Sequence, residues 1–201
     1  MPFTQENRFL QIITEQWQDS LLIKGFSGTE GVSSLFSYEL DLVANLPVIP
    51  EDIVGQGLTI AIQLRDDSQR FFNGLVAGLR SNGEALSNDS SETPLLSYTA
   101  TLVPWFWLLT RSSNSKVFQN VSVIEILQSI FEEHELHDFR DNTQEGYEPR
   151  EYCVQYRETD FAFLSRLMEE EGIFYYFVHE NNCHTLVLAD SVSEHQPCPG
   201  Q

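Results

Sequence analysis

The sequence predicts a mixed β and α+β fold, with a small antiparallel β-barrel over residues 1–113 followed by an α+β domain over residues 114–201. Three observations predict this division. Apolar residues alternate with polar ones through the first half, and after about residue 120 they take helical spacing. The polar stretch 111–116 lies between these patterns and is the best candidate linker. With 41% hydrophobic residues, the 201-residue chain has ample material for a core.

Two segments of the first half alternate with a period of two. Residues 36–42 and 58–64 each place their apolar side chains at every second position, which predicts half-buried strands. Residues 66–69 form a polar turn, and residues 70–80 return as the second strand of a hairpin. Several antiparallel strands without a full-length helix between them favour a small barrel or sandwich.

Glycines and a polar stretch shape the rest of this half. Gly74 and Gly78 lie within a strand and predict bulges or bends, which a curled sheet requires. Residues 82–94 are nearly all polar or small, and we expect a mobile loop. Residues 96–102 form another alternating strand that Pro104 ends.

Five consecutive bulky apolar residues follow at positions 105–109. Such a density of large side chains on a surface would be unusual, so the segment is either core or interface. We favour packing under the barrel, because an apolar cluster is more often core.

The second half carries helix signals. Ser122 and Glu125 have the spacing of a capping box at the start of a helix of about three turns. Its inward face is predicted to hold Val123, Ile124, Leu127, Ile130 and Phe131.

A second helix is predicted over residues 160–171, with Gly172 positioned to close it. Its inward face is predicted to hold Phe161, Leu164, Leu167 and Met168. Residues 173–179 and 184–190 then form an apolar hairpin, which completes an α+β arrangement.

The charge balance narrows the range of partners. The chain has 30 acidic and 11 basic residues, a net charge of −19. Residues 1–113 carry 13 acidic and 6 basic residues (−7), and the remainder carries 17 and 5 (−12). Such a surface repels phosphate, so nucleic acid and anionic membranes are poor partners. Solubility explains most of the excess, and a docking face for a basic partner remains an alternative.

The first residues lack the basic and apolar regions of a signal peptide. No apolar run reaches the roughly 18–20 residues that span a bilayer. We therefore expect the chain to fold in the cytoplasm. If it leaves the cell, a route other than general export must carry it.

The consecutive carboxylates Glu169, Glu170 and Glu171 resemble acid/base groups at first sight. Consecutive helical residues point about 100° apart, so the three cannot converge on one bond as glycoside hydrolysis requires. We interpret them as a solvated helix end. Their charge opposes the helix dipole by roughly 0.3–1 kcal/mol each, and Arg166 offsets only part of this. The remainder hints at a tertiary or intersubunit basic partner.

Histidine and cysteine offer few metal ligands in suitable spacing. His134 and His137 are three residues apart, whereas a zincin site needs two histidines four apart. The better zinc candidate combines Cys183 and His184 with His195 and Cys198, against the alternative that these are unconnected surface residues. The odd number of cysteines, Cys153, Cys183 and Cys198, is not a disulfide framework.

No Gly-rich phosphate loop and no G-x-S-x-G elbow occurs in the sequence. We therefore assign no catalytic, cofactor-binding or metal-binding residue, and we predict no cofactor and no enzyme activity.

The stretch 150–177, REYCVQYRETDFAFLSRLMEEEGIFYYF, closely resembles the VgrG family of type VI secretion spike proteins, whose hub is shared with the baseplate hub and late-control proteins of contractile-tailed phages. Residues 31–40, 72–76 and 104–109 resemble the first hub strands, the next hairpin and the aromatic turn, in family order over nearly the whole chain. The stretch reads as a strand, a helix and a strand in which packing explains every large residue, as expected of a scaffold.

The resemblance implies a structural role. Family members form homotrimers whose barrels make a pseudo-sixfold ring on the hexameric Hcp tube. An OB-fold and a needle follow, tipped by a PAAR protein, and effectors travel on the spike. The implied protein assembles in the cytoplasm and is secreted through the type VI apparatus without a signal peptide. It has neither nucleic acid nor a small molecule as a partner.

The chain stops at Gln201, before the OB-fold, the needle and most of a second barrel that the resemblance implies. We interpret it as a truncated piece that would trimerise only at full length. Three alternatives remain: a tail hub of a contractile phage or phage-derived device, an enzyme using the Glu or His clusters, and a metal-stabilised binding module.

Overall fold

The computed structural model describes residues 4–14, 17, 20–84 and 95–194. The chain forms two compact units. The first unit comprises Met1–Glu30, Leu35–Pro104 and His179–His184, and the second comprises Gly31–Ser34, Trp105–Val178 and Thr185–Gln201. The domain boundary at residue 113 stays a prediction, since spatial clustering does not show which segments fold independently.

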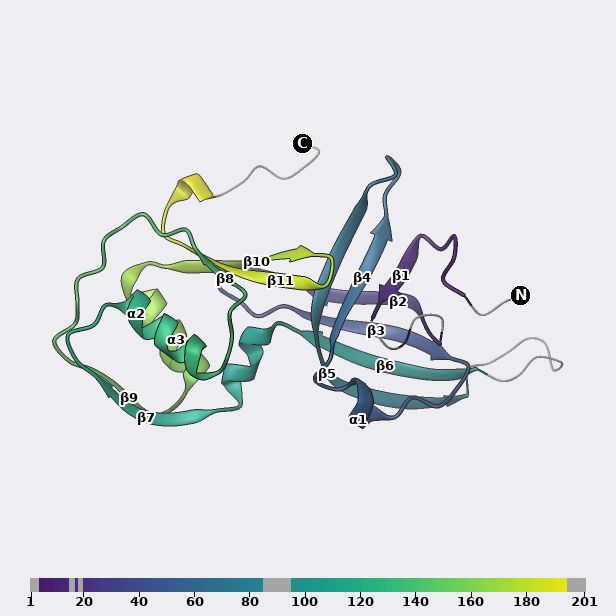
Figure 1. Ribbon diagram of the computed structural model, residues 1–201, viewed down its shortest axis with the longest axis horizontal. Helices are drawn as coiled ribbons and strands as arrows, with labels where there is room; N and C mark the ends of the chain where they lie inside the picture. The colour runs from purple at the N-terminus through teal and green to yellow at the C-terminus, as the bar shows by residue number, and fades with distance from the viewer. Residues whose placement is uncertain (1–3, 15–16, 18–19, 85–94, 195–201) are drawn as a thin grey trace. The chain divides into compact units, whose positions relative to one another are not determined.

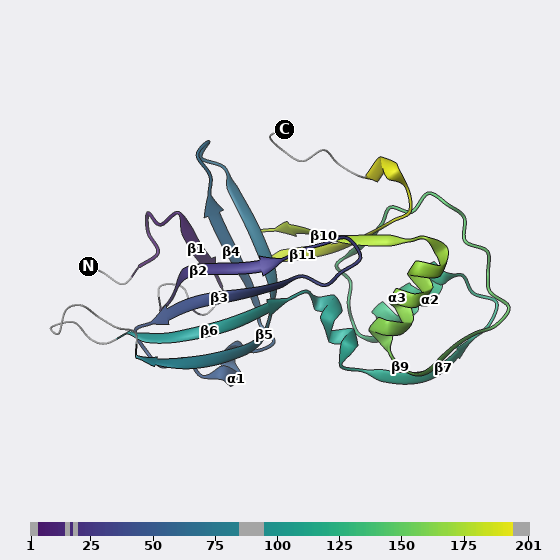
Figure 2. The same ribbon diagram turned by 180° about the vertical axis from the view of Figure 1, so that it is seen from behind.

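One six-stranded antiparallel sheet forms the first unit (Figures 1 and 2). Its order is β1-β4-β5-β6-β3-β2, and the edge strands β1 and β2 approach each other, so the sheet curls into a half-barrel. The short helix α1 packs on β5. The elements are β1 (Leu10–Ile13), β2 (Leu21–Thr29), β3 (Ser37–Ala44), α1 (Pro50–Ile53), β4 (Gly57–Gln63), β5 (Gln69–Glu84) and β6 (Leu96–Val103).

The predicted strands and the β4–β5 hairpin are confirmed. In β3 the apolar residues Tyr38, Leu40 and Leu42 are buried and alternate with exposed polar residues up to Asp41, as a period of two requires. For β4 the prediction of a half-buried strand is wrong, because Thr59 and Ala61 are buried as well. Thr59 is covered by the turn of a later hairpin, whose residue Asn182 donates its backbone N–H to Oγ1 of Thr59 (3.2 Å).

The free edge of β1 is closed by a side chain. The Nε2 group of Gln5 donates to the carbonyl of Ile12 (2.9 Å), and the N–H of Ile12 donates to Oε1 of Gln5 (2.6 Å). The amide of Gln5 thus makes the two bonds that a neighbouring strand would make. This satisfies backbone groups that an edge strand otherwise presents to any passing strand.

Glycines act in two ways in this sheet. The register of β5 against β6 shifts at Gly78 and again at Gly83, so the predicted bulge at Gly78 is confirmed. Gly74 is not at a bulge: a Cβ there would lie 3.0 Å from the carbonyl oxygen of Val103 and 3.2 Å from the ring of Phe36. Residues 82–84 belong to β5, which corrects the predicted loop, and residues 85–94 lie outside the described part of the chain.

A substitution at Gly28 tests the packing of β2 on β3. A Cβ at this position would lie 2.3 Å from Cδ1 of Tyr38 and 2.5 Å from the carbonyl oxygen of Ser37. We expect Gly28→Ala to lower the free energy of unfolding by about 1–3 kcal/mol, because Tyr38 and the strand must shift. Chemical denaturation measures this. Gly25→Ala is the matched control, since a Cβ there meets nothing within 4 Å. Equal losses for both variants would contradict the close approach.

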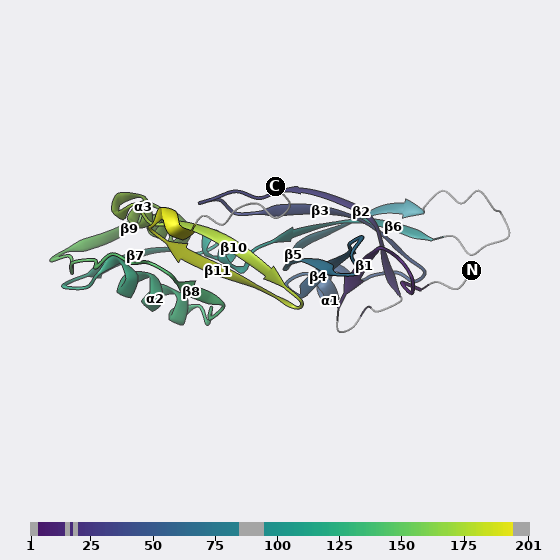
Figure 3. The same cartoon turned by 90° about the horizontal axis from the view of Figure 1, so that it is seen from above.

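Among its described residues, the second unit contains four helical segments and two small sheets. β10 and β11 form a long hairpin (Figure 3), β8 pairs with β11 in parallel, and β7 pairs with β9. The elements are η1 (Trp105–Thr110), β7 (Ser113–Phe118), α2 (Val123–Glu133), β8 (Phe139–Asp141), β9 (Cys153–Thr159), α3 (Asp160–Glu171), β10 (Phe174–Glu180), β11 (Cys183–Ala189) and η2 (Val192–Glu194).

The capping box at the start of α2 is confirmed. Ser122 accepts from the N–H of Glu125, and the carboxylate of Glu125 accepts from the N–H of Ser122 (2.7 Å). On its inward face, Ile126 is fully buried, whereas Ile124 is only half-buried. The apolar stripe of α2 is therefore turned slightly from the predicted one.

Helix α3 has its predicted bounds, and Gly172 ends it in the left-handed conformation (φ 73°). Its buried face includes Phe163, which stacks on Phe118 of β7 with ring centroids 5.7 Å apart. The predicted inward residue Phe161 is half-buried instead. The ring of Phe161 contacts that of Phe106 at 5.2 Å, so it lines the margin of the core.

The aromatic segment at 105–109 is core, but it does not pack under the barrel as predicted. It forms the 3-10 helix η1 in the second unit, with Trp105, Phe106 and Leu109 buried. The ring of Phe106 meets those of Phe131 and Tyr175 edge-to-face at 5.9 and 5.3 Å. The partners of this segment come from later in the chain, which local spacing does not reveal.

The predicted linker 111–116 is also wrong, because most of it lies in β7. The register joins Ser113 to Thr159 and Phe118 to Cys153. The first four residues of β7 are all polar, so the strand lacks the alternation of apolar and polar residues that predicts a half-buried strand. Its hydrogen bonds come from β9, some forty residues later.

Candidate functional site

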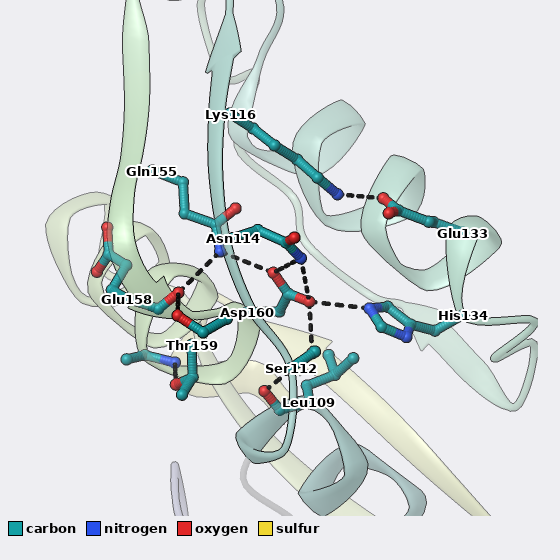
Figure 4. A network of polar contacts seen from close by, with 12 residues as sticks. Leu109, Ser112, Asn114, Lys116, Glu133, His134, Gln155, Glu158, Thr159 and Asp160 are labelled. Atoms are coloured by element: carbon teal, nitrogen blue, oxygen red, sulfur yellow. Dashed lines mark hydrogen bonds and ion pairs between the residues drawn. The ribbon is translucent and has the colours of Figure 1, made fainter.

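The most densely bonded polar group of the second unit is the carboxylate of Asp160 (Figure 4). Oδ1 accepts from Nε2 of Gln155 (2.7 Å) and Nδ2 of Asn114 (3.0 Å). Oδ2 accepts from Oγ of Ser112 (2.6 Å) and lies 2.9 Å from Nε2 of His134. The carboxylate therefore joins the start of α3 to β9, to β7 with the residue before it, and to the end of α2.

The hydrogen bonds of Asp160 outweigh its burial. The side chain is 0% exposed, and burial alone would raise the pKa of the carboxyl group. The bonds from Gln155, Ser112, Asn114 and His134 favour the charged form and lower this pKa to about 2. Asp160 is thus ionised at neutral pH, and both of its oxygens accept hydrogen bonds.

Ser112, His134 and Asp160 are the residue types of a catalytic triad, but their connections differ from those of a triad. In a triad the histidine lies between the serine and the aspartate and takes the serine proton. Here the aspartate lies in the middle, and both Ser112 and His134 bond to its Oδ2 atom. Because Ser112 donates to a carboxylate of low pKa, no base activates its hydroxyl group. The arrangement stabilises a fold and prepares no nucleophile.

A second polar cluster lies in the first unit, where the turn of the β10–β11 hairpin meets β5. Nδ1 of His179 lies 3.1 Å from the backbone nitrogen of Asn73 and 3.0 Å from its carbonyl oxygen. Nδ1 of His184 lies 2.7 Å from Oδ1 of Asn73, whose Nδ2 donates to Thr59 (2.8 Å). The pairing of β6 with β5 begins only at Leu75, so His179 bonds a ladder position that β6 does not reach.

Both histidines of this cluster are kept neutral. Burial lowers the pKa of His184 to about 3, and the neighbouring His179 adds to this effect. Burial also lowers the pKa of His179, while Glu30 acts in the opposite direction. Nε2 of His179 lies 3.2 Å from the hydroxyl of Tyr38, which also bonds to Glu30. A neutral His179 that donates from Nε2 to Tyr38 accepts the N–H of Asn73 at Nδ1, and in this tautomer Nδ1 has no proton to donate to the carbonyl oxygen of Asn73.

The acidic end of α3 has the tertiary basic partner that its charge suggested. Arg150 donates to Glu170 (2.6 Å) and to Glu171 (2.5 Å), and Arg166 donates to Glu170 (3.3 Å). Glu169 is exposed. The three carboxylates are therefore spread over separate contacts and do not surround a common point.

The other predicted candidates are dispersed. His137 is exposed, His134 is bound to Asp160, and the buried His184 faces Asn73 while Cys183 is half-exposed. His195 and Cys198 lie outside the described residues. In the described ranges, no three His, Cys, Asp or Glu side chains lie close enough together to hold a metal ion.

A cavity of about 220 Å³ opens within the first unit. It is lined by Ile13, Thr14, Trp17, Ile53, Gln56, Gly57, Leu58, Thr59, Asn73 and Asn182. None of these side chains titrates near neutral pH, so the cavity walls offer no general acid or base. Across the described parts of the chain, no helix has the length and apolarity needed to span a bilayer.

Residues 29–201 match the family described as phage tail baseplate hub (GPD). The chain is 42% identical over 193 residues to the type VI secretion system spike protein VgrG1a of Pseudomonas aeruginosa, covering 96% of the chain and 29% of that protein. It is 40% identical over 200 residues to VgrG1b of the same organism, covering 99% of the chain and 26% of that protein.

A solved structure shares the fold. The E. coli c3393 protein is described as a component of the type VI secretion system with structural similarity to the T4 bacteriophage tail proteins gp27 and gp5. It superposes with a TM-score of 0.75 at 27% identity, covering 88% of the chain and 50% of that structure. The chain therefore belongs to the phage tail baseplate hub (GPD) family, and it resembles the N-terminal region of VgrG spike proteins. It spans about a quarter of the length of these curated relatives.

Sequence reasoning missed both polar clusters. It placed Ser112 and Asn114 in a linker and treated Asp160 only as the first residue of a helix. Asp160 begins an otherwise apolar helix directly after a strand, and this position was the one available signal. His179 and Asn73 are 106 residues apart, so only the fold brings them together.

Proposed function

We propose that the chain is the hub region of a type VI secretion spike and that its role is mechanical support. The observation that carries this proposal is that nearly the whole of this chain matches two VgrG spike proteins at 40–42% identity. The bonding of Asp160 and of the His179–Asn73 cluster supports it, because both groups lock separate segments together. In this proposal no group of the chain acts as a catalyst.

In the assembled spike, three copies of the complete protein form the hub. The hub sits on the hexameric Hcp tube, and regions beyond residue 201 supply the needle, which carries a PAAR tip and effectors. The protein assembles in the cytoplasm without a signal peptide and leaves through the type VI apparatus. A tail hub of a contractile phage is the second candidate, because the matching family is itself a phage baseplate hub family.

The solution mass of the complete protein tests this proposal. Light scattering on the purified protein is expected to give three times the mass of one chain. A strictly monomeric protein would contradict the hub assignment. Export separates the two candidates: a secretion spike reaches the medium only in cells with a working type VI apparatus, whereas a phage hub sediments with phage particles.

A further inference from the structure

The outer face of the β7–β9 sheet carries large side chains that the unit does not cover. Tyr152 is 61% exposed, Tyr156 is 66% exposed and Val117 is 55% exposed. The expectation that packing explains every large residue of the 150–177 stretch is therefore wrong for both tyrosines. Val154 lies opposite Val117 in the register and completes the face.

The opposite face of the same two strands packs against the helices of the second unit. Cys153 and Gln155 alternate with the exposed residues and are buried. Phe118 stacks on Phe163 of α3, and Lys116 pairs with Glu133 of α2. Figures 1 and 2 show both helices on this side of the strands. A two-stranded ribbon with an apolar, tyrosine-bearing outer face has the composition of a protein–protein contact.

The outward positions of these two strands lack the negative charge that the chain carries overall. The outward positions within β7 and β9 hold Ser113, Ser115, Val117, Val154 and Tyr156, and none of them is acidic. At a bulge next to Tyr156, Arg157 (φ 52°) places its guanidinium carbon 5.3 Å from the ring centroid of that tyrosine. In a chain with 30 acidic and 11 basic residues, this face is thus an apolar patch with an arginine at its margin.

Charge complementarity indicates what covers the patch. Two copies with a net charge of −19 repel each other over most of their surfaces. The repulsion is weakest where one copy presents neutral tyrosines and Arg157, and the acidic surface of the next copy supplies partners for that arginine. A contact between two different surfaces closes into a ring when the rotation that it repeats divides a full turn, and gives an open filament otherwise.

We infer that the outer face of β7–β9, formed by Val117, Tyr152, Val154 and Tyr156 with Arg157 at its margin, is an interface with the next copy of this chain. The inference rests on the proposed homotrimeric hub and assigns the surface through which its copies meet. Tyr156 lies at the centre of the contact, and Arg157 pairs with carboxylates of the neighbouring copy.

A photo-crosslinking amino acid placed at position 156 of the complete protein tests this inference. Benzoylphenylalanine is an aromatic replacement for an exposed tyrosine, so the fold is retained. Irradiation of the purified protein is expected to give a covalent product of two chains on a denaturing gel. The matched control carries the same residue in place of Val192, which is 82% exposed in the same unit, and should give several-fold less of this product.

The outcomes distinguish this inference from the proposed function. A protein that has the mass of a trimer but crosslinks at position 156 only within its own chain overturns the inference and leaves the hub assignment standing. Equal yields at positions 156 and 192 also overturn it, because they indicate random encounters. A monomeric protein overturns both proposals.

Discussion

Replacing Asp160 by alanine is expected to lower the free energy of unfolding by about 3 kcal/mol or more. The substitution removes the acceptor of four side chains at once and leaves the buried donor of Gln155 and the half-buried donor of Asn114 without their shortest bonds. It also removes a negative charge from the first turn of α3, where the helix dipole favours one. Urea denaturation followed by circular dichroism measures the loss.

The control for this prediction is Asp138→Ala, which removes a carboxylate that is exposed in the same unit. We expect it to change the free energy of unfolding by less than about 0.5 kcal/mol. Because the pKa of Asp160 is lowered to about 2, its contribution is fully present above about pH 4 and is lost only as the pH falls toward 2. The loss caused by Asp160→Ala should therefore be the same at pH 5 and pH 8. A loss no larger than that of Asp138→Ala would show that the network stabilises nothing.

Mild acid is expected to destabilise the first unit through the His179–His184 cluster. An unfolded chain protonates its histidines near pH 6.5, whereas burial holds the pKa of His184 at about 3 in the fold. Between these values the unfolded state binds more protons, so stability falls as the pH falls. For His184 alone, the slope rises from a fraction of its maximum near pH 7 toward that maximum of about 1.4 kcal/mol per pH unit near pH 5. Denaturation midpoints between pH 7 and pH 5 measure it, above the range in which most carboxylates titrate.

The charged groups around the cluster determine how it responds. Glu30 favours protonation of His179, whereas Arg70 of β5 and burial oppose it. Tyr38 stays protonated, because burial and the bond to Glu30 raise its pKa. The hydrogen-exchange protection of residues 179–184, relative to the intrinsic exchange rate at each pH, should fall first on acidification, since these residues contact the sheet through the two imidazoles.

Two variants separate this effect from a general response to acid. His184→Gln replaces the buried imidazole by a neutral amide, so we expect lower stability at pH 7 and a clearly shallower dependence on pH. His137→Gln alters an exposed histidine and should leave the slope unchanged. If wild type and His184→Gln lose stability in parallel between pH 7 and pH 5, His184 is not the titrating group.

The sequence predicts those elements whose signals are local. Helix α3 has its predicted bounds because Asp160 and Gly172 mark both ends within one continuous segment. The capping box of α2 and the hairpin of β4 and β5 are equally local, since each depends on residues only a few positions apart. Family resemblance then supplied the architecture that spacing alone could not.

The two largest errors, at the predicted linker and at the aromatic segment, share one physical cause, which is contact between distant segments. β7 looks like a linker because its strand character comes from β9, and Trp105 was assigned to the wrong unit because its partner Phe131 follows it. The sequence showed Asp160 as the first residue of a helix. It did not show the hydrogen bonds of Asp160, because the four partner residues lie at separate positions in the chain. Tyr156 shows the reverse case, where a strand was predicted correctly but its exposed face was not.

The side-chain amide of Gln5 also bears on unwanted association between copies of the chain. An uncapped β1 would let sheets from neighbouring molecules zip together at random when the local concentration rises. Because the amide already takes the N–H and carbonyl of Ile12, stacking through that border is blocked without help from another strand. A single glutamine near the beginning of the chain therefore lowers the tendency of β1 to aggregate edge to edge.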